Sequence, residues 1–339
     1  MPTIYDLSRQ LGLGVSTISK ALNGYSDVSE KTRQRVLEAA QEMGFQPNSN
    51  AQALKTKRSR LIGVLHQDIQ GGGLMHPHFG TILEFFRRSV EEHGYELMLM
   101  NQNTGRRRRS FVEQCRYRNF EGMLIMVAEQ NDPDVQQLIA GEVPKVLVDA
   151  ECPGQCSVLS DNVQGGIQAV EYLYAMGHRR IAHLAAPLKT LAGDERMAGY
   201  REGLTRVGLK FEPELTIEAP GYRVNDGRTA MSALLRRSGA FSAVFAGSDS
   251  LAFGAMDVLR QRGILVPEQI SIVGFDNLDS NMMSLWPLTT IAQNREQIGR
   301  MAADMLFKQI SGQSPEVKNL RLPVQLVERT SCTPLKHNY

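Results

Sequence analysis

The chain has 339 residues, of which 42% are hydrophobic and 22% are charged, and its formal net charge is +2 at pH 7. This composition is typical of a folded globular protein and excludes an intrinsically disordered chain, while the absence of any apolar stretch of roughly 18–20 residues excludes a bilayer-spanning protein. A chain of this length exceeds one compact core and predicts two or three domains.

Residues 1–46 predict an all-α head of three short helices. The first helix opens at Thr3, with Asp6 three residues later as a capping box, and Gly12 ends it. The second helix runs from Val15 to about residue 22, and the third follows Ser29 and ends near residue 43. The start of the chain has neither a basic leader nor an apolar signal segment, so we expect a cytoplasmic protein with no membrane partner.

A helix, a tight turn with glycine and a second short helix make up the helix-turn-helix arrangement. The outward side chains of the second helix are small and polar or carry methyl groups, which suits contact with base edges and phosphates. Residues 1–60 carry nine Lys or Arg and five Asp or Glu, whereas the rest of the chain has a net charge of −2. A basic head of this kind favours a polyanionic partner, although a generic three-helix bundle would show the same periodicity.

Residues 47–60 predict a hinge helix and linker. Pro47 stops the third helix, and the stretch that follows holds Leu54 as its one large apolar side chain before a basic tail. A helix this short is not stable alone in water, so we expect it to fold on DNA with Leu54 as a wedge between base steps. The alternative is a plain linker with Leu54 packed on a neighbouring domain.

From residue 61 to 335 the chain alternates apolar strands with helices, which predicts two lobes built on doubly wound parallel sheets. We assign the first lobe to about 61–157 and 289–317, and the second to about 158–287 and 318–335. The predicted strands are 61–65, 95–100, 122–127, 145–148, 180–185, 243–246, 270–275, 289–292 and 322–327. The predicted helices are 79–93, 165–176, 197–207, 226–236, 251–262 and 295–310.

Polar side chains follow the ends of several predicted strands. Asp149, Ser248, Asp276 and Gln293 each stand at such an end, where open α/β sheets bind their ligands. Carboxylates here, together with the guanidinium of Arg196, can bracket sugar hydroxyls, and the aromatic rings of Phe79 and Tyr222 can stack on a pyranose face. Each Asp or Ser after a strand can also be a simple helix cap.

At this point the chain resembles the lactose-repressor/galactose-repressor family over essentially its whole length. The motifs that carry the resemblance are Thr3-Ile4-Tyr5-Asp6-Leu7, Ser16-Thr17-Ile18-Ser19-Lys20-Ala21-Leu22-Asn23, Val28-Ser29-Glu30-Lys31-Thr32-Arg33, Gly44-Phe45-Gln46-Pro47-Asn48, Ala51 and Leu54, Ile62-Gly63-Val64, Gly177-His178-Arg179-Arg180-Ile181, Arg196-Met197-Ala198-Gly199-Tyr200, Ser271-Ile272-Val273-Gly274-Phe275-Asp276 and Pro287-Leu288-Thr289-Thr290-Ile291. The resemblance implies a periplasmic-binding-protein-like sensor and a transcriptional regulator, most simply a repressor, that has no cofactor and no enzymatic activity.

The resemblance also implies partners and site residues. The partners are palindromic operator DNA, a second copy of the chain and a small-molecule effector, a sugar or glycoside held between the lobes. The implied DNA contacts are Thr3, Tyr5, Val15, Ser16, Thr17, Ser19, Lys20, Asn23, Asn48, Ala51 and Leu54. The implied effector contacts are His78, Phe79, Asp149, Asp161, Arg196, Tyr222, Ser248, Asp276 and Gln293.

Several positions depart from the family pattern. Gly14 stands where the family usually has the Ser that caps the recognition helix, so the cap has no side-chain oxygen. Ser248 replaces a frequent Asn or Asp and shortens the reach toward a ligand. The loop at 70–78 is longer and richer in Gly and His than the usual version. No leucine heptads follow Thr333, so we expect a homodimer without the tetramerising tail of some relatives.

Competing classes fit less of the chain. A periplasmic sugar-binding protein would share the body, but it would need a signal peptide and would lack residues 1–60. A nucleotide-using enzyme has only the Gly71–Gly73 run in its favour, without a phosphate-loop lysine. Cys152 and Cys156 are candidates for a redox pair, but a surface loop with reduced thiols is the simpler interpretation.

Two further groups of residues, one rich in histidine and one rich in arginine, each allow two interpretations. His66, His76 and His78 include possible metal ligands, but no matching Cys or Asp cluster accompanies them, so a rim or solvent role is favoured and no metal is predicted. The arginines at 106–109 can hold an anion, but charge runs usually face water, which favours a solvated helix start.

Overall fold

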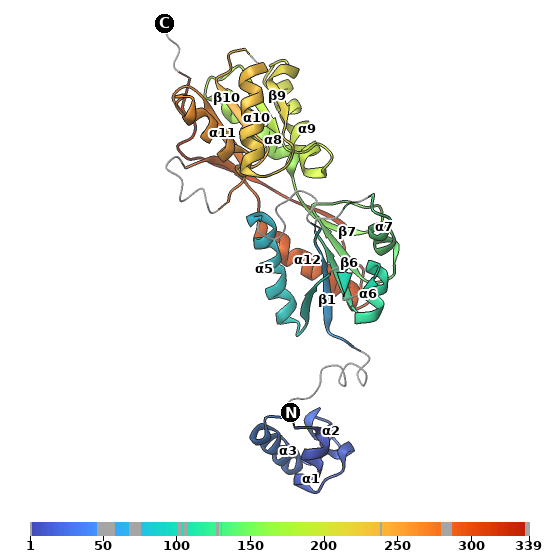
Figure 1. Ribbon diagram of the computed structural model, residues 1–339. Coiled ribbons are helices and arrows are strands. Elements are labelled where there is room, and N and C mark those ends of the chain that lie inside the picture. Colours follow the sequence, from blue (N-terminus) through green and yellow to red (C-terminus); the bar gives the residue numbers. More distant parts are fainter. Residues whose placement is uncertain are drawn as a thin grey trace. The chain divides into compact units, whose positions relative to one another are not determined.

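The computed structural model describes residues 2–45, 58–67, 76–100, 103–104, 107–126, 129, 131–237, 239–278 and 287–335. The chain divides into two compact units, Met1–Arg60 and Leu61–Tyr339 (Figure 1). Most of the predicted hinge, including Asn48, Ala51 and Leu54, lies outside the described residues.

The head consists of helices α1 (Ile4–Leu11), α2 (Val15–Leu22) and α3 (Glu30–Met43). The predicted capping box is confirmed, because Asp6 N–H donates to the Thr3 hydroxyl and the Asp6 carboxylate accepts from Thr3 N–H. Gly14 caps α2 without a side-chain hydrogen bond, also as predicted. The small core is built from one apolar stripe on each helix. Its buried members are Leu7, Ile18, Ala21, Val28, Val36, Ala39 and Ala40.

The second unit carries two six-stranded sheets covered by helices, an α/β architecture as predicted. Its first part holds β1 (Leu61–Leu65), α5 (Pro77–Glu92), β2 (Glu96–Leu99), β3 (Asn103–Thr104), β4 (Arg107–Arg108), α6 (Phe111–Arg118), β5 (Gly122–Ile125), α7 (Pro133–Ala140), β6 (Lys145–Val148) and β7 (Cys156–Ser160). Its second part holds α8 (Asn162–Ala175), β8 (Ile181–Ala185), α9 (Leu191–Arg206), the 3-10 helix η2 (Pro213–Leu215), β9 (Thr216–Glu218), α10 (Val224–Arg237), β10 (Ala243–Ala246), α11 (Asp249–Gln261), β11 (Ser271–Asp276) and β12 (Thr289–Ala292). Three further elements, α12 (Arg295–Ile310), β13 (Asn319–Leu322) and β14 (Gln325–Val327), complete the unit.

The first lobe is the parallel sheet β13-β7-β6-β5-β1-β2 with helices on both faces. Ile62 and Val64 of β1 contribute to the core under α5 and α12, whereas Leu65 contributes to the core under α6 and α7. Alternate residues of one strand thus serve opposite faces, which is why these strands are continuous apolar runs.

The second lobe is the sheet β14-β12-β11-β10-β8-β9, in which only β14 runs antiparallel to its neighbour. Helices α8 and α9 cover one face and α10 and α11 the other (Figure 1). Strands β10 and β11 are buried along their whole length. Because β8, β10 and β11 pair in parallel, their carboxyl ends lie at one edge of the lobe.

The chain crosses between the lobes three times, after β7, after β12 and after β13 (Figure 1). The predicted lobe boundaries therefore need correction: the boundary at 157 cuts β7, which lies wholly in the first lobe, and two later strands are assigned to the wrong lobe. Strand Thr289–Ala292 pairs with β11 in the second lobe, and Asn319–Leu322 pairs with β7 in the first. The predicted strand 322–327 is two strands in different sheets, separated by Pro323, whose ring nitrogen cannot donate to a ladder.

Other predictions also need correction. Arg107–Arg108 form a short strand that pairs with β3, so these arginines do not begin a helix; α6 begins at Phe111. Cys156 is buried in β7 and is not in a surface loop, and burial raises the pKa of its thiol.

Candidate ligand site and DNA interface

A cavity of about 450 Å³ lies within the second unit, with walls from both lobes. The first lobe contributes the start of α5 and the residues after β5 and β6; the second contributes the start of α9, the residues after β9 and the end of β11. The volume falls in the range of small-molecule sites. The lining residues are His76, His78, Phe79, Met126, Glu129, Asn131, Asp149, Ala150, Glu151, Leu188, Lys189, Thr190, Leu191, Ala192, Asp194, Arg196, Tyr222 and Asp276.

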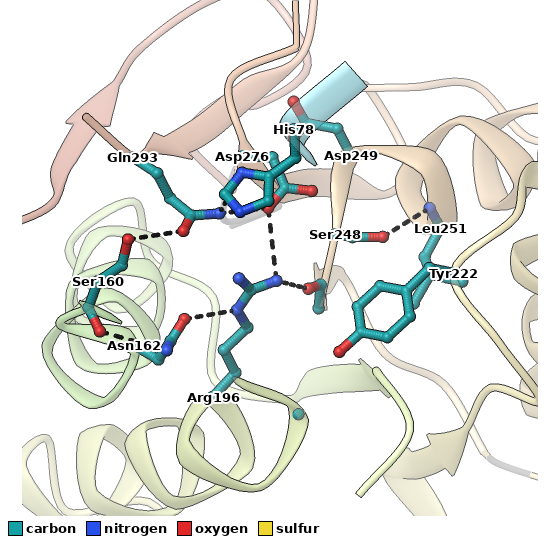
Figure 2. Close-up of polar contacts among 12 residues, drawn as sticks. His78, Ser160, Asn162, Arg196, Tyr222, Ser248, Asp249, Leu251, Asp276 and Gln293 are labelled. Carbon is teal, nitrogen blue, oxygen red and sulfur yellow. Dashed lines mark hydrogen bonds and ion pairs between the residues drawn. The ribbon is translucent and has the colours of Figure 1, made fainter. Parts of the chain in front are cut away.

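Arg196 of α9 is the buried cation of this cavity, only 3% exposed. Its Nε donates to Asn162 Oδ1 at 2.9 Å, and its Nη1 donates to the Gly247 carbonyl at 2.7 Å (Figure 2). The guanidinium carbon lies 3.8 Å from the centre of the Phe275 ring. The other terminal nitrogen, Nη2, has no hydrogen bond among the described residues. The guanidinium is thus held rigidly, and the two N–H groups of Nη2 are available for a ligand.

Asp276, at the end of β11, faces Arg196 and is also buried. Its Oδ1 accepts from Gln293 Nε2 at 2.6 Å and lies 3.5 Å from Arg196 Nη1. Gln293 in turn accepts from Ser160 at 2.7 Å (Figure 2). Oδ2 of Asp276 has no partner among the described residues, so a carboxylate acceptor remains available beside the arginine donor.

Asp149, at the end of β6, provides the acidic group of the first lobe. Its Oδ2 lies 2.8 Å from Nε2 of His78, and Nδ1 of that histidine lies 3.4 Å from the amide nitrogen of Gln293. Because an amide nitrogen only donates, we assign Nδ1 as the acceptor and Nε2–H as the donor to Asp149. A continuous set of polar contacts thus joins both lobes through the crossing residue Gln293.

The backbone is strained at both acidic strand ends. Asp149 has φ 54° and Asp276 has φ 116°, a region that side chains other than glycine rarely adopt. The next residue, Asn277, has φ 54°. Strain of this kind is typical of functional sites, where the surrounding structure holds it in place.

Aromatic rings line the rest of the cavity. Phe79 packs edge-on against His78, with ring centres 4.9 Å apart. The Tyr222 hydroxyl lies 2.8 Å from Thr190 Oγ1, and burial raises the pKa of this phenol, so it stays protonated. Apolar ring faces beside fixed polar groups suit a sugar, which has an apolar face and a rim of hydroxyls.

Three predicted effector contacts do not line the cavity. Ser248 is buried and caps α11, accepting from Leu251 N–H at 3.2 Å, and Asp161 caps α8, accepting from Gln164 N–H at 3.0 Å. Neither lines the cavity. Gln293 does not line it either, but holds Asp276.

Sequence reasoning missed Asn162 and Thr190, which orient Arg196 and Tyr222. Their partners lie 34 and 32 residues away. Local sequence patterns do not predict contacts between residues so far apart in the chain. The sequence-based prediction also did not include His76 among the ligand contacts. The position of His76 in the unusual His-rich loop was a signal that could have indicated it. Among the described residues, no group of three His, Cys, Asp or Glu side chains is placed to hold a metal ion.

The head presents a polar surface on α2. Ile18 and Ala21 are buried in its core, whereas Ser16, Lys20 and Asn23 are exposed. The other predicted contacts in this helix, Val15, Thr17 and Ser19, are partly exposed, and Thr3 and Tyr5 beside it are exposed. Lys20 is paired with Asp27, and Asn23 donates to the Ser19 carbonyl at 2.5 Å.

Comparison with known families decides between the classes considered above. Residues 3–48 match the family described as bacterial regulatory proteins, lacI family, and residues 62–330 match periplasmic binding proteins and sugar binding domain of LacI family. The chain belongs to the LacI family. It is 31% identical over 336 residues to the HTH-type transcriptional regulator CelR of Thermobifida fusca, covering 97% of this chain and 98% of that protein.

Solved LacI-family structures share the fold. The transcriptional regulator CelR–cellobiose complex matches with 30% identity and a TM-score of 0.72, covering 98% of this chain and 100% of that one. The Lac repressor dimer bound to operator and the anti-inducer ONPF matches with 28% identity and a TM-score of 0.85, covering 98% and 99%. LacI-family relatives are thus DNA-binding regulators with small-molecule effectors. Within the described part of this chain, no helix has the length and apolarity to cross a membrane.

Proposed function

We propose that this protein is a transcriptional repressor whose affinity for operator DNA is controlled by a neutral sugar or glycoside bound between the sensor lobes. The observation that carries the proposal is the fixed pair of Arg196 and Asp276, two lining residues whose Nη2 and Oδ2 have no partner among the described residues. Vicinal hydroxyls can satisfy such a pair, whereas an apolar ligand would leave both groups unpaired.

In this proposal Arg196, Asp276 and Asp149 contact the sugar hydroxyls, while Phe79 and Tyr222 pack on its ring. His78 and Gln293 position the acidic groups. Asp161 and Ser248 are assigned to helix capping, because their side chains are already engaged by backbone N–H groups. CelR is described in complex with cellobiose, so a β-linked disaccharide is the first probe to use.

The head binds DNA through the exposed side of α2. We propose that Val15, Ser16 and Thr17 approach base edges, while Thr3, Tyr5, Ser19, Lys20 and Asn23 contact phosphates and sugars. Asn48 and Ala51 would extend the contact along the hinge, and Leu54 would wedge into the minor groove. One head of this size is small for specific binding alone, so a homodimer on a palindromic operator is proposed.

The protein is proposed to act by binding alone, in the cytoplasm, without catalysis. Its relatives are regulators, and the three charged groups described above, Asp149, Arg196 and Asp276, are each held in a contact and suited to hydrogen bonding with hydroxyls.

Thermal unfolding of the purified full chain against glucose, galactose, ribose, cellobiose, lactose and maltose tests the sensor. A ligand at 100 times its dissociation constant adds about 2.7 kcal/mol to the free energy of unfolding. At least one sugar is expected to raise the Tm, and Leu54→Ala is expected to respond to it like the parent while binding operator more weakly. No response to any sugar would contradict the proposed sensor, and equal operator affinity would contradict the wedge.

A further inference from the structure

His76 stands directly before α5 and lines the cavity, but no described residue forms a hydrogen bond with either of its ring nitrogens. Both Nδ1 and Nε2 are buried and have no hydrogen-bond partner among the residues that the structure describes. It occupies the N-cap position of α5 and yet makes no side-chain capping bond. Buried polar atoms without a partner are rare and unfavourable in folded proteins. At the wall of a cavity, the simplest occupant to satisfy them is a ligand.

The ring is held in place by aromatic contacts that span the two lobes. Its centre lies 5.6 Å from Phe79 in the first lobe and 6.4 Å from Tyr222 in the second, the latter edge-on at 89°. The Tyr222 hydroxyl is in turn fixed by Thr190. The imidazole therefore sits in a defined orientation without using its nitrogens, which suits a group reserved for recognition.

Its surroundings favour an uncharged ring. Burial is the main cause that lowers the pKa of His76, and His78 and Arg196 act in the same direction, whereas Asp276 and Asp149 oppose them. A neutral imidazole offers one donor and one acceptor, which matches a hydroxyl group. A carboxylate or phosphate only accepts, and five carboxylates line this cavity against two cations, Lys189 and Arg196.

We propose that His76 is a specificity-determining contact, whose ring bonds a hydroxyl of an uncharged polyhydroxy ligand and makes the cavity reject sugar phosphates and sugar acids. This inference rests on the proposed sugar-binding function. It assigns to His76 a role in choosing the ligand.

The test uses the full chain and, as probe, whichever of the six sugars above raises the parent Tm most. His76→Phe keeps an aromatic ring against Phe79 and Tyr222 but removes both nitrogens, while His76→Gln restores a donor and an acceptor. Calorimetry is expected to show at least about ten-fold weaker binding for His76→Phe and substantial recovery for His76→Gln. The control is His93→Phe, the same exchange at the exposed far end of α5, which is expected to bind like the parent.

The ligand-free Tm separates recognition from structure. Removing two unpartnered nitrogens is expected to leave the Tm of His76→Phe unchanged or higher. Glucose 6-phosphate and gluconate are expected to give no Tm shift with the parent. Three results would overturn this inference alone. The first is a parent-like sugar affinity in His76→Phe, and the second is a lowered ligand-free Tm in His76→Phe together with no recovery of sugar affinity in His76→Gln. The third is a Tm shift of the parent with either anion. A parent that responds to none of the six sugars would overturn the proposed function and this inference with it.

Discussion

At the scale of single residues, the site depends on how each charge is held. Arg196 has hydrogen bonds from two of its nitrogens and a ring beneath it, and Asp276 accepts from Gln293 as well as facing the arginine. A buried charge is tolerated only with such partners. Removing one member of the pair leaves the other buried and unpaired, with the full free-energy cost of its desolvation. In the proposed function, the rigidity that this arrangement gives lets Arg196 and Asp276 select a ligand by hydrogen bonding.

Asp276→Asn is expected to weaken sugar binding by roughly 10- to 100-fold, corresponding to about 1–3 kcal/mol, because the acceptor charge beside Arg196 is lost. Calorimetric titration measures it. The matched variant is Ser248→Ala, which removes the cap of α11 and is expected to lower the free energy of unfolding by about 1 kcal/mol without changing sugar affinity. If Ser248→Ala weakens sugar binding as much as Asp276→Asn, the assignment of Ser248 to capping is wrong.

His183 predicts a pH dependence of stability. It stacks between Tyr200 and Phe245, its Nδ1 lies 2.8 Å from the Phe245 carbonyl, and burial lowers its pKa to about 4. In the unfolded chain its pKa is about 6.5, so the unfolded state takes up the proton first. The neutral ring therefore makes its full contribution to the free energy of unfolding above pH 6.5. This contribution is lost progressively as the pH falls toward 4, by about 3 kcal/mol in all.

His183→Asn keeps an N–H donor but has no ring to protonate. Free energies of unfolding measured from pH 7 to pH 4 are expected to fall more steeply for the parent than for the variant. Curves of equal steepness would show that protonation of His183 does not limit stability in acid.

At the scale of elements, close packing of α8 and α9 fixes where Arg196 lies. A Cβ at Gly199 would lie 2.2 Å from the Val163 carbonyl, and a Cβ at Gly166 would lie 2.7 Å from the carbonyl of Arg196 itself. These glycines let the two backbones approach directly, so the arginine is positioned by helix packing as well as by its own hydrogen bonds.

Gly199→Ala is therefore expected to lower the free energy of unfolding by about 1–3 kcal/mol and to weaken sugar binding, because α9 must move away from α8. Thermal unfolding and calorimetry provide the two measurements. Ala198→Ser, on the exposed side of the same helix, is expected to change neither. A Gly199→Ala protein with parent-like stability would show that the helices can separate at no cost.

The elements also show what the sequence could predict. Strands such as Leu61–Leu65 and Lys145–Val148 were predicted with their observed bounds, because both faces are buried and the apolar run is unbroken. Cys156–Ser160 was missed because its serines and cysteine give no such run, although it is fully buried. The acidic strand ends were predicted, but the sheet to which Thr289–Ala292 and Asn319–Leu322 belong is decided by pairing across the fold, which no local pattern records.

At the scale of the whole molecule, the chain combines a DNA-binding head with a two-lobed sensor, as its LacI-family membership describes. The polar contacts from Asp149 through His78 and Gln293 to Asp276 join the two lobes beside a crossing strand. A ligand that binds both ends of this set would favour one relative arrangement of the lobes. It can change the affinity for operator DNA only if it binds one arrangement more tightly than the other.

The most direct test is a calorimetric titration of the responding sugar into the full chain, alone and with a palindromic duplex enriched by this protein from a random DNA library. Thermodynamic linkage requires that the sugar and the duplex change each other's affinity by the same factor, typically about 5- to 150-fold. We expect the duplex to weaken sugar binding and the sugar to weaken duplex binding equally, as induction demands. An identical sugar affinity with and without the duplex would contradict the central claim that the sensor controls the head.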